Sequence, residues 1–97
     1  MNTPEQCQSL AQVRTEIDRL DEQIVPLLAE RGRYVLAAAR FKNNPDEVRA
    51  PQRVEQVVER VRTLADQHGA LPEVVESVYR TMIAAFIEAE LRHWQRR

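Results

Sequence analysis

The sequence predicts an all-α fold of three helices, long, medium and long, in a single domain over residues 1–97. Apolar residues recur at alternating spacings of three and four over three separate stretches, which is the pattern of amphipathic helices. Prolines stand where two of these stretches begin, and no stretch shows the alternation of a half-buried strand. Because 97 residues lie near the lower limit for a self-sufficient core, we expect the long helices to bury their stripes in an oligomer.

The first predicted helix runs from about Ser9 to Lys42, and Ser9 with Gln12 has the spacing of a capping box. Pro26 removes a backbone donor and should bend the helix near residue 22, whereas Gly32 would let another backbone approach closely. The apolar pattern stays in phase across both residues, so we predict one helix. Its seam consists of Leu10, Val13, Ile17, Leu20, Ile24, Leu27, Tyr34, Ala38 and Phe41.

The other two helices follow a break that is rich in turn residues. This break begins at Asn43 and is expected to continue as a connection to Ala50. The medium helix is predicted from Pro51 to His68, where Gly69 ends it. The last helix is predicted from Pro72 to about residue 94.

Composition excludes several classes of protein. The net charge of −1 argues against a nucleic-acid-binding protein, and no apolar run approaches membrane-spanning length. The single cysteine, Cys7, cannot form an internal disulfide and fits a reducing compartment. The first residues lack the basic and apolar regions of a signal peptide, so we expect a cytoplasmic protein with no membrane contact.

Three cations on the first helix are candidates for binding an anion. Arg31 occupies the apolar seam, where a guanidinium must be paired or meet an anion. Lys42 lies about 20° around the helix from Arg31 and roughly 16 Å along it, so the two share a face. Arg14 lies roughly 25 Å along the axis from Arg31, too far for one small anion to touch both in one chain. An antiparallel second copy would bring its Arg14 beside Arg31, which suggests a dimer with shared sites.

Glu90 lies on the apolar stripe of the last helix, between Phe86 and Trp94. One interpretation is a structural partner for an arginine, and Arg31 is a seam arginine that could pair with such a glutamate. The other is a carboxyl group that desolvation keeps protonated, so that it can donate a hydrogen bond near neutral pH. The sequence leaves both open.

Other chemistries find little support in the sequence. His68 and His93 are isolated from any spacing of metal ligands, and two glycines cannot make a phosphate-binding loop. We therefore expect no metal and no cofactor. Cations facing a helical interior, with one acid among apolar residues, suit a small multiply anionic ligand and electrostatic catalysis.

These residues resemble the small all-helical chorismate mutase family in type, order and spacing. Arg14 stands in Val-Arg-x-x-Ile-Asp-x-Leu-Asp, Arg31 in Leu-Ala-Glu-Arg, and Lys42 ends the first helix. Glu90 falls where the family has a glutamine or, in some members, a glutamate. Three segments resemble the isochorismate pyruvate lyase branch in particular: Thr3-Pro4-Glu5-x-Cys7, Ala39-Arg40-Phe41-Lys42 and Ala50-Pro51-x-Arg53-Val54.

The resemblance implies an intertwined homodimer with two equivalent, cofactor-free sites. Arg14 from the partner subunit and Arg31 would hold the two carboxylates of the substrate, chorismate or isochorismate. Lys42 and Glu90 would hydrogen-bond the ether oxygen of its enolpyruvyl group, and Arg53 would line the same pocket. Both reactions of the family break a carbon–oxygen bond in a pericyclic step, so donors aimed at that oxygen stabilise the transition state.

The resemblance does not decide between the two reactions. We put first the rearrangement of chorismate to prephenate, as in aromatic amino acid biosynthesis, because it is the general activity of the fold. The alternative is release of pyruvate from isochorismate to leave salicylate, and a non-catalytic helical dimerisation module is more remote. Ala50 and Val54 favour the lyase, because typical mutases carry acidic residues there. Glu90 replaces the glutamine of the typical lyase, so we expect activity that falls as the pH rises and a flat profile in Glu90→Gln.

Overall fold

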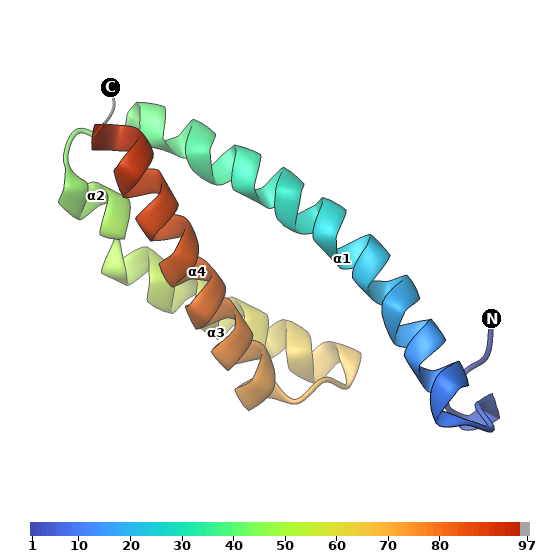
Figure 1. Ribbon diagram of the computed structural model, residues 1–97. Helices are drawn as coiled ribbons and strands as arrows, with labels where there is room; N and C mark the ends of the chain where they lie inside the picture. Colours follow the sequence, from blue (N-terminus) through green and yellow to red (C-terminus); the bar gives the residue numbers. More distant parts are fainter. Residues whose placement is uncertain (96–97) are drawn as a thin grey trace. The chain divides into compact units, whose positions relative to one another are not determined.

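The computed structural model describes residues 1–95 and has three long helices where the sequence predicts them. They are α1 (Leu10–Ala38), α3 (Pro51–His68) and α4 (Pro72–Gln95), and no strand occurs among the described residues (Figure 1). The prediction of an all-α chain with long, medium and long helices is confirmed. In this part of the chain, no helix combines the length and the apolar character needed to cross a bilayer.

The chain forms two compact units that divide within α1, Met1–Tyr34 and Val35–Arg97. The first unit begins with a short 3-10 turn, η1 (Pro4–Gln6), where the Thr3 N–H donates to the Gln6 side chain at 3.0 Å. Ser9 then caps α1, because its Oγ accepts from the Gln12 N–H at 3.1 Å. The expected start of the long helix at Ser9 is thereby confirmed to within one residue.

The N-terminal segment folds back along the first turns of α1. The Asn2 N–H donates to Glu16 Oε2 at 3.4 Å, and Arg19 Nε donates to the other oxygen of the same carboxylate at 2.9 Å. The hydrogen bond from Arg19, aided by the one from Asn2, holds the pKa of Glu16 below its usual value. One carboxylate thus connects the segment before the helix to the helix itself.

Helix α1 continues without interruption past Pro26, as the unbroken apolar pattern predicts. The apolar stripe of α1 is exposed along the whole first unit, and Leu27 and Tyr34 are 65% and 71% exposed. The other exposed stripe residues of this unit are Leu10, Val13, Ile17, Leu20 and Ile24. Since burial of apolar surface is favourable by roughly 25 cal/mol of free energy per Å², this stripe favours association.

The end of the first helix and the following connection differ from the prediction. The α-helix stops at Ala38, a 3-10 turn η2 (Ala39–Phe41) follows, and Lys42 is already extended, with φ −106° and ψ 141°. The expected loop contains a short helix, α2 (Pro45–Arg49), capped by Asn44. An asparagine before a proline is typical of a turn and also of a helix start, and here the helix start prevails.

Ala50 joins α2 to α3 in a left-handed conformation, with φ 37°. Its N–H donates to Asp46 O at 3.0 Å and its carbonyl accepts from the Val54 N–H at 3.1 Å, so it ends one helix and begins the next. A side chain in this region costs about 1 kcal/mol. The two backbone hydrogen bonds hold the residue there.

Helices α3 and α4 lie side by side as a hairpin in the second unit (Figure 1). Val58, Val61 and Ala65 of α3 are buried and form its inner face. Gly69 ends α3 as predicted, with φ 72° and its N–H directed at the last carbonyls of the helix. Apart from Gly69 and its two neighbours in the chain, no atom lies within 4 Å of the place where a Cβ would stand, so glycine is needed there for its backbone conformation alone.

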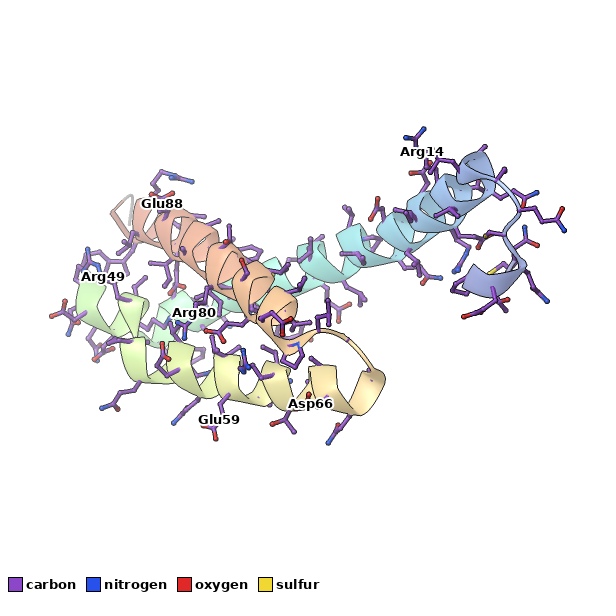
Figure 2. The ribbon with its side chains drawn as sticks, turned by 90° about the horizontal axis from the view of Figure 1, so that it is seen from below. Arg14, Arg49, Glu59, Asp66, Arg80 and Glu88 are labelled. Atoms are coloured by element: carbon purple, nitrogen blue, oxygen red, sulfur yellow. The ribbon has the colours of Figure 1, made fainter. Side chains whose placement is uncertain are left out.

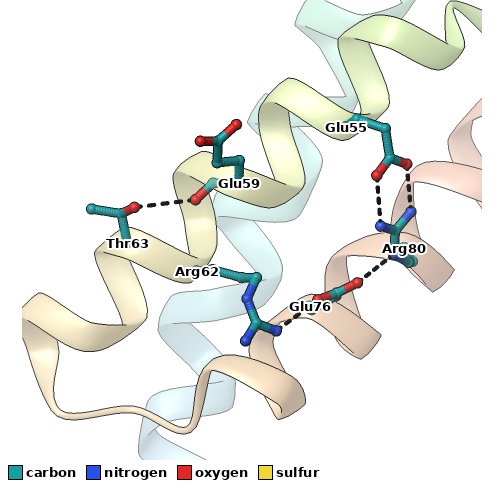
Figure 3. A network of polar contacts seen from close by, with 6 residues as sticks. All are labelled: Glu55, Glu59, Arg62, Thr63, Glu76 and Arg80. Atoms are coloured by element: carbon teal, nitrogen blue, oxygen red, sulfur yellow. Dashed lines mark hydrogen bonds and ion pairs between the residues drawn. The ribbon is translucent and has the colours of Figure 1, made fainter.

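An ionic network crosses the exposed side of this hairpin (Figure 3). Arg80 of α4 donates two hydrogen bonds to Glu55 of α3, at 2.8 and 2.9 Å, and a third to Glu76 at 2.7 Å. Arg62 of α3 donates to the other oxygen of Glu76 at 2.7 Å. The hydrogen bonds from Arg80 to both carboxylates, with that from Arg62 to Glu76, lower the pKa of Glu55 and Glu76.

Candidate active site

Two candidate residues from opposite ends of the second unit's sequence meet in the structure. Lys42 Nζ lies 2.7 Å from Glu90 Oε2, although 48 residues separate them in the chain. Glu90 belongs to the last turns of α4 and its side chain is 2% exposed, whereas Lys42 is 23% exposed. The lysine therefore reaches from the edge of the unit to a buried carboxyl group.

The contact answers part of the question that the sequence leaves open about Glu90. A buried carboxylate is costly unless a charge or a hydrogen bond compensates it. The ammonium of Lys42 provides both, so Lys42 is a structural partner of Glu90 in this unit. The role of Glu90 as a proton-carrying donor stays a prediction.

Lys42 and Glu90 together can bind an anionic or oxygen-rich ligand. An ammonium has three donors, and Glu90 takes only one of them, so two others can point at a ligand. A lysine that is 23% exposed is accessible from outside, whereas the carboxyl group behind it is shielded from water. The ammonium therefore lies on the solvent side of the pair, and the carboxyl group lies in surroundings of lower dielectric constant.

Arg53 is an exposed residue in the first turn of α3, within the same unit as the pair. A helix start has backbone N–H groups that favour anions, and a cation there adds to this field. Its expected role in lining the pocket stays a prediction.

Arg14 and Arg31 belong to the first unit, where Arg14 is exposed and Arg31 is half-buried. Arg14 projects outward from the first turns of α1 (Figure 2). Because α1 is one continuous helix over both residues, their 17-residue separation corresponds to roughly 25 Å along its axis. A single small ligand cannot contact both arginines of one chain. The residue after Arg31, Gly32, is buried.

Sequence reasoning missed the residues that hold the turn bearing Lys42. Asn44 caps α2 through its side chain, and Glu47 accepts a hydrogen bond from the Asn43 N–H at 2.7 Å. The signal was present: an asparagine, a proline at the next position and a glutamate three residues after the cap. The same residues favour turns, so the sequence alone predicts a plain connection there.

No group of three or more histidine, cysteine, aspartate or glutamate residues in the described part of the chain could hold a metal ion. The single cysteine, Cys7, is free and half-buried in the N-terminal segment.

The sequence is similar to proteins of one family. The family model for chorismate mutase type II matches residues 13–91. An isochorismate pyruvate lyase from Pseudomonas aeruginosa is 36% identical over 95 residues, which cover 98% of this chain and 94% of that protein. A chorismate mutase from Methanocaldococcus jannaschii is 27% identical over 77 residues, 78% of each chain. A bifunctional chorismate mutase/prephenate dehydratase from Aquifex aeolicus is 30% identical over 86% of this chain but only 24% of its own length.

Proposed function

Because this chain belongs to the chorismate mutase type II family, we propose that it catalyses a cofactor-free pericyclic reaction on isochorismate or chorismate. The observation that carries the proposal is the contact of 2.7 Å between Lys42 and Glu90. Both reactions of these substrates break the carbon–oxygen bond of the enolpyruvyl ether, and negative charge grows on that oxygen. Donors that meet this charge bind the transition state more tightly than the substrate.

Lys42 is the first of these donors. Its ammonium keeps one hydrogen bond to Glu90, and a second N–H points at the ether oxygen. Glu90 is the second donor in its protonated form, because a carboxylic acid accepts through one oxygen and donates through the other. The ionised form would repel the developing charge, so only the protonated form can act as this donor.

A second copy of the chain supplies the remaining substrate contact. The exposed stripe of α1 favours association, and an antiparallel copy would place Arg14 of the partner subunit beside Arg31. Two guanidinium forks would then hold the two carboxylates of the substrate and keep its reacting carbons close. Arg53 lines the same pocket. The functional protein in this proposal is a homodimer with two shared sites.

Of the two reactions, we put the release of pyruvate from isochorismate first. The isochorismate pyruvate lyase matches almost the whole of this chain at 36% identity. Ala50 and Val54 support the same choice, because they replace the acidic residues of typical mutases. The rearrangement of chorismate to prephenate, which the sequence analysis puts first, is the second candidate, and the carboxyl group of Glu90 favours it.

Separate assays with isochorismate and chorismate test the proposal. The purified protein is incubated with each substrate from acid to neutral pH, and salicylate, pyruvate and prephenate are followed. Salicylate and pyruvate in equal amounts support the lyase, and prephenate as the dominant product supports the mutase. Formation of none of these products at any pH contradicts an enzyme of either kind.

Arg31→Ala distinguishes an enzyme from a non-catalytic dimerisation module. An enzyme loses turnover in this variant but stays a dimer, because the arginine binds substrate. A scaffold has no turnover to lose, and the variant changes only its stability. Turnover and mass by light scattering, measured on the same sample, separate these cases.

A further inference from the structure

The turn that carries Lys42 is held at both ends. On one side the Lys42 N–H donates to Ala39 O at 3.2 Å, which closes the 3-10 turn η2. On the other side the chain enters α2 only three residues later, at Pro45. A lysine side chain has four flexible carbons, so the direction of its ammonium depends on how well its backbone is fixed.

Reciprocal hydrogen bonds fix the far side of this turn. The Asn43 N–H donates to Glu47 Oε2 at 2.7 Å, and the Glu47 N–H donates to Asn44 Oδ1 at 2.9 Å. The side chain of Glu47 thus reaches back beyond the cap residue to the residue that follows Lys42. The first bond gives the Asn43 N–H an acceptor, and the second adds to the bond of 3.2 Å from the Glu47 N–H to Asn44 O.

Helix α2 is in turn anchored to the helix that carries Glu90. Val48, next to Glu47, is buried, and α2 packs against α4. A connected path therefore runs from Lys42 through Asn43 and Glu47 to α4 and ends at Glu90.

We propose that Glu47 is a positioning residue that aims the ammonium of Lys42. The inference rests on the proposed function, in which Lys42 donates to the ether oxygen. Preorganised donors are effective because they need no rearrangement when charge develops. If Glu47 releases the Asn43 N–H, the turn gains alternative conformations and the ammonium occupies its productive place for less of the time. Substrate binding by the arginines is not affected.

Glu47→Ala, Glu47→Gln and Asp46→Ala test this inference in the full-length protein. Asp46 is a matched control, because it lies on the same helix and its side chain is 97% exposed. We expect Glu47→Ala to lower kcat about fivefold with KM unchanged, which corresponds to the loss of a capping interaction of about 1 kcal/mol. Glu47→Gln retains an acceptor oxygen and should stay within about twofold of the original kcat, as should Asp46→Ala.

Amide hydrogen exchange of Asn43 provides a readout that does not depend on turnover. We expect faster exchange in Glu47→Ala, and no change in Glu47→Gln or Asp46→Ala. A fall in thermal stability with unchanged kcat would mean that Glu47 is only structural and would overturn the inference. Unchanged exchange of Asn43 would overturn it as well. Inactivity of the unsubstituted protein with both substrates would refute the proposed function instead. The exchange measurement would still test whether Glu47 fixes the conformation of the turn.

Discussion

Two ionic contacts in the unit Val35–Arg97 have the same length but lie in different surroundings. Lys42 Nζ is 2.7 Å from Glu90 Oε2, and Arg80 Nε is 2.7 Å from Glu76 Oε2. The carboxyl group of Glu90 is almost fully buried, whereas Glu76 and Arg80 remain in contact with water. Solvent screens the second contact and leaves the first largely unscreened. Burial, and not distance, therefore decides how much each contact matters.

The two regions also differ in what remains after one group is removed. In the hairpin network, Arg80 contacts two carboxylates and Glu76 contacts two arginines, and each group is hydrated as well. Removal of one member leaves charges that water can solvate. Removal of Lys42 leaves a buried carboxylate without its cation, and this costs much more than the pair itself contributes. The buried pair is therefore the better candidate for an active site, whereas the exposed network stabilises the packing of α3 against α4.

The largest expected effect is the loss of stability in Lys42→Met. Because Glu90 stays buried without its cation, we expect the free energy of unfolding to fall by about 3 kcal/mol at neutral pH. Urea unfolding measures this change. The double variant Lys42→Met, Glu90→Gln buries no charge and should recover most of the loss. If the single and double variants are equally stable, the account of the buried pair is wrong.

The next effect is on the pH dependence of turnover in Glu90→Gln. An amide keeps a hydrogen-bond donor and has no proton to lose, so its activity should be flat where that of the original protein falls as the pH rises. Initial rates across acid to neutral pH, at saturating substrate, measure both profiles. The same slope in both proteins would rule out Glu90 as a proton-carrying donor.

A smaller effect is expected for Arg80→Ala, which breaks the exposed network. The lowered pKa values of Glu55 and Glu76 mean that the network stabilises the fold above their usual value of 4.5. This contribution is lost as the pH falls through the lowered values in the folded state. The variant should therefore have a slightly lower Tm at pH 7, and the difference should vanish in acid. A difference that persists in acid would point to lost packing of the arginine stem.

The smallest effect is expected for Arg62→Ala, because Arg62 makes a single contact to Glu76 and Arg80 still occupies the other oxygen. Its Tm should differ little from that of the original protein in low salt, and the difference should disappear in 1 M salt (a Debye length of about 3 Å). Thermal unfolding in both buffers measures this. A larger loss than in Arg80→Ala would mean that the network is centred on Arg62.

Local sequence signals were sufficient for most of the helices. Pro51 and Pro72 at helix starts and Gly69 at a helix end act through their own backbone, so their effects can be inferred from the residue type. The short helix α2 was missed, because Asn44 and Pro45 favour a turn and a helix start alike. The hydrogen bonds of Glu47 and the packing of Val48 into the core favour the helix.

The site follows less directly from local sequence signals than the helices do. Glu90 could be recognised as an acid on an apolar stripe, but its partner lies 48 residues away in the chain. Such a pairing depends on how α2 and α4 pack, and no local sequence pattern indicates this packing. The family resemblance implies that Lys42 and Glu90 both hydrogen-bond the ether oxygen of the substrate. The structure shows these two side chains in contact with each other. The contributions of Arg14, Arg31 and Arg53 stay predictions.

Mixing two inactive variants tests the central claim, a site around Lys42 and Glu90 that Arg14 of a second copy completes. Arg14→Ala and Lys42→Met are each expected to be inactive as homodimers. Refolded together in equal amounts, they should form heterodimers with one intact site, so that about a quarter of the original activity returns. A mixture that stays inactive although light scattering shows dimers, or full activity in Arg14→Ala alone, would contradict a shared site.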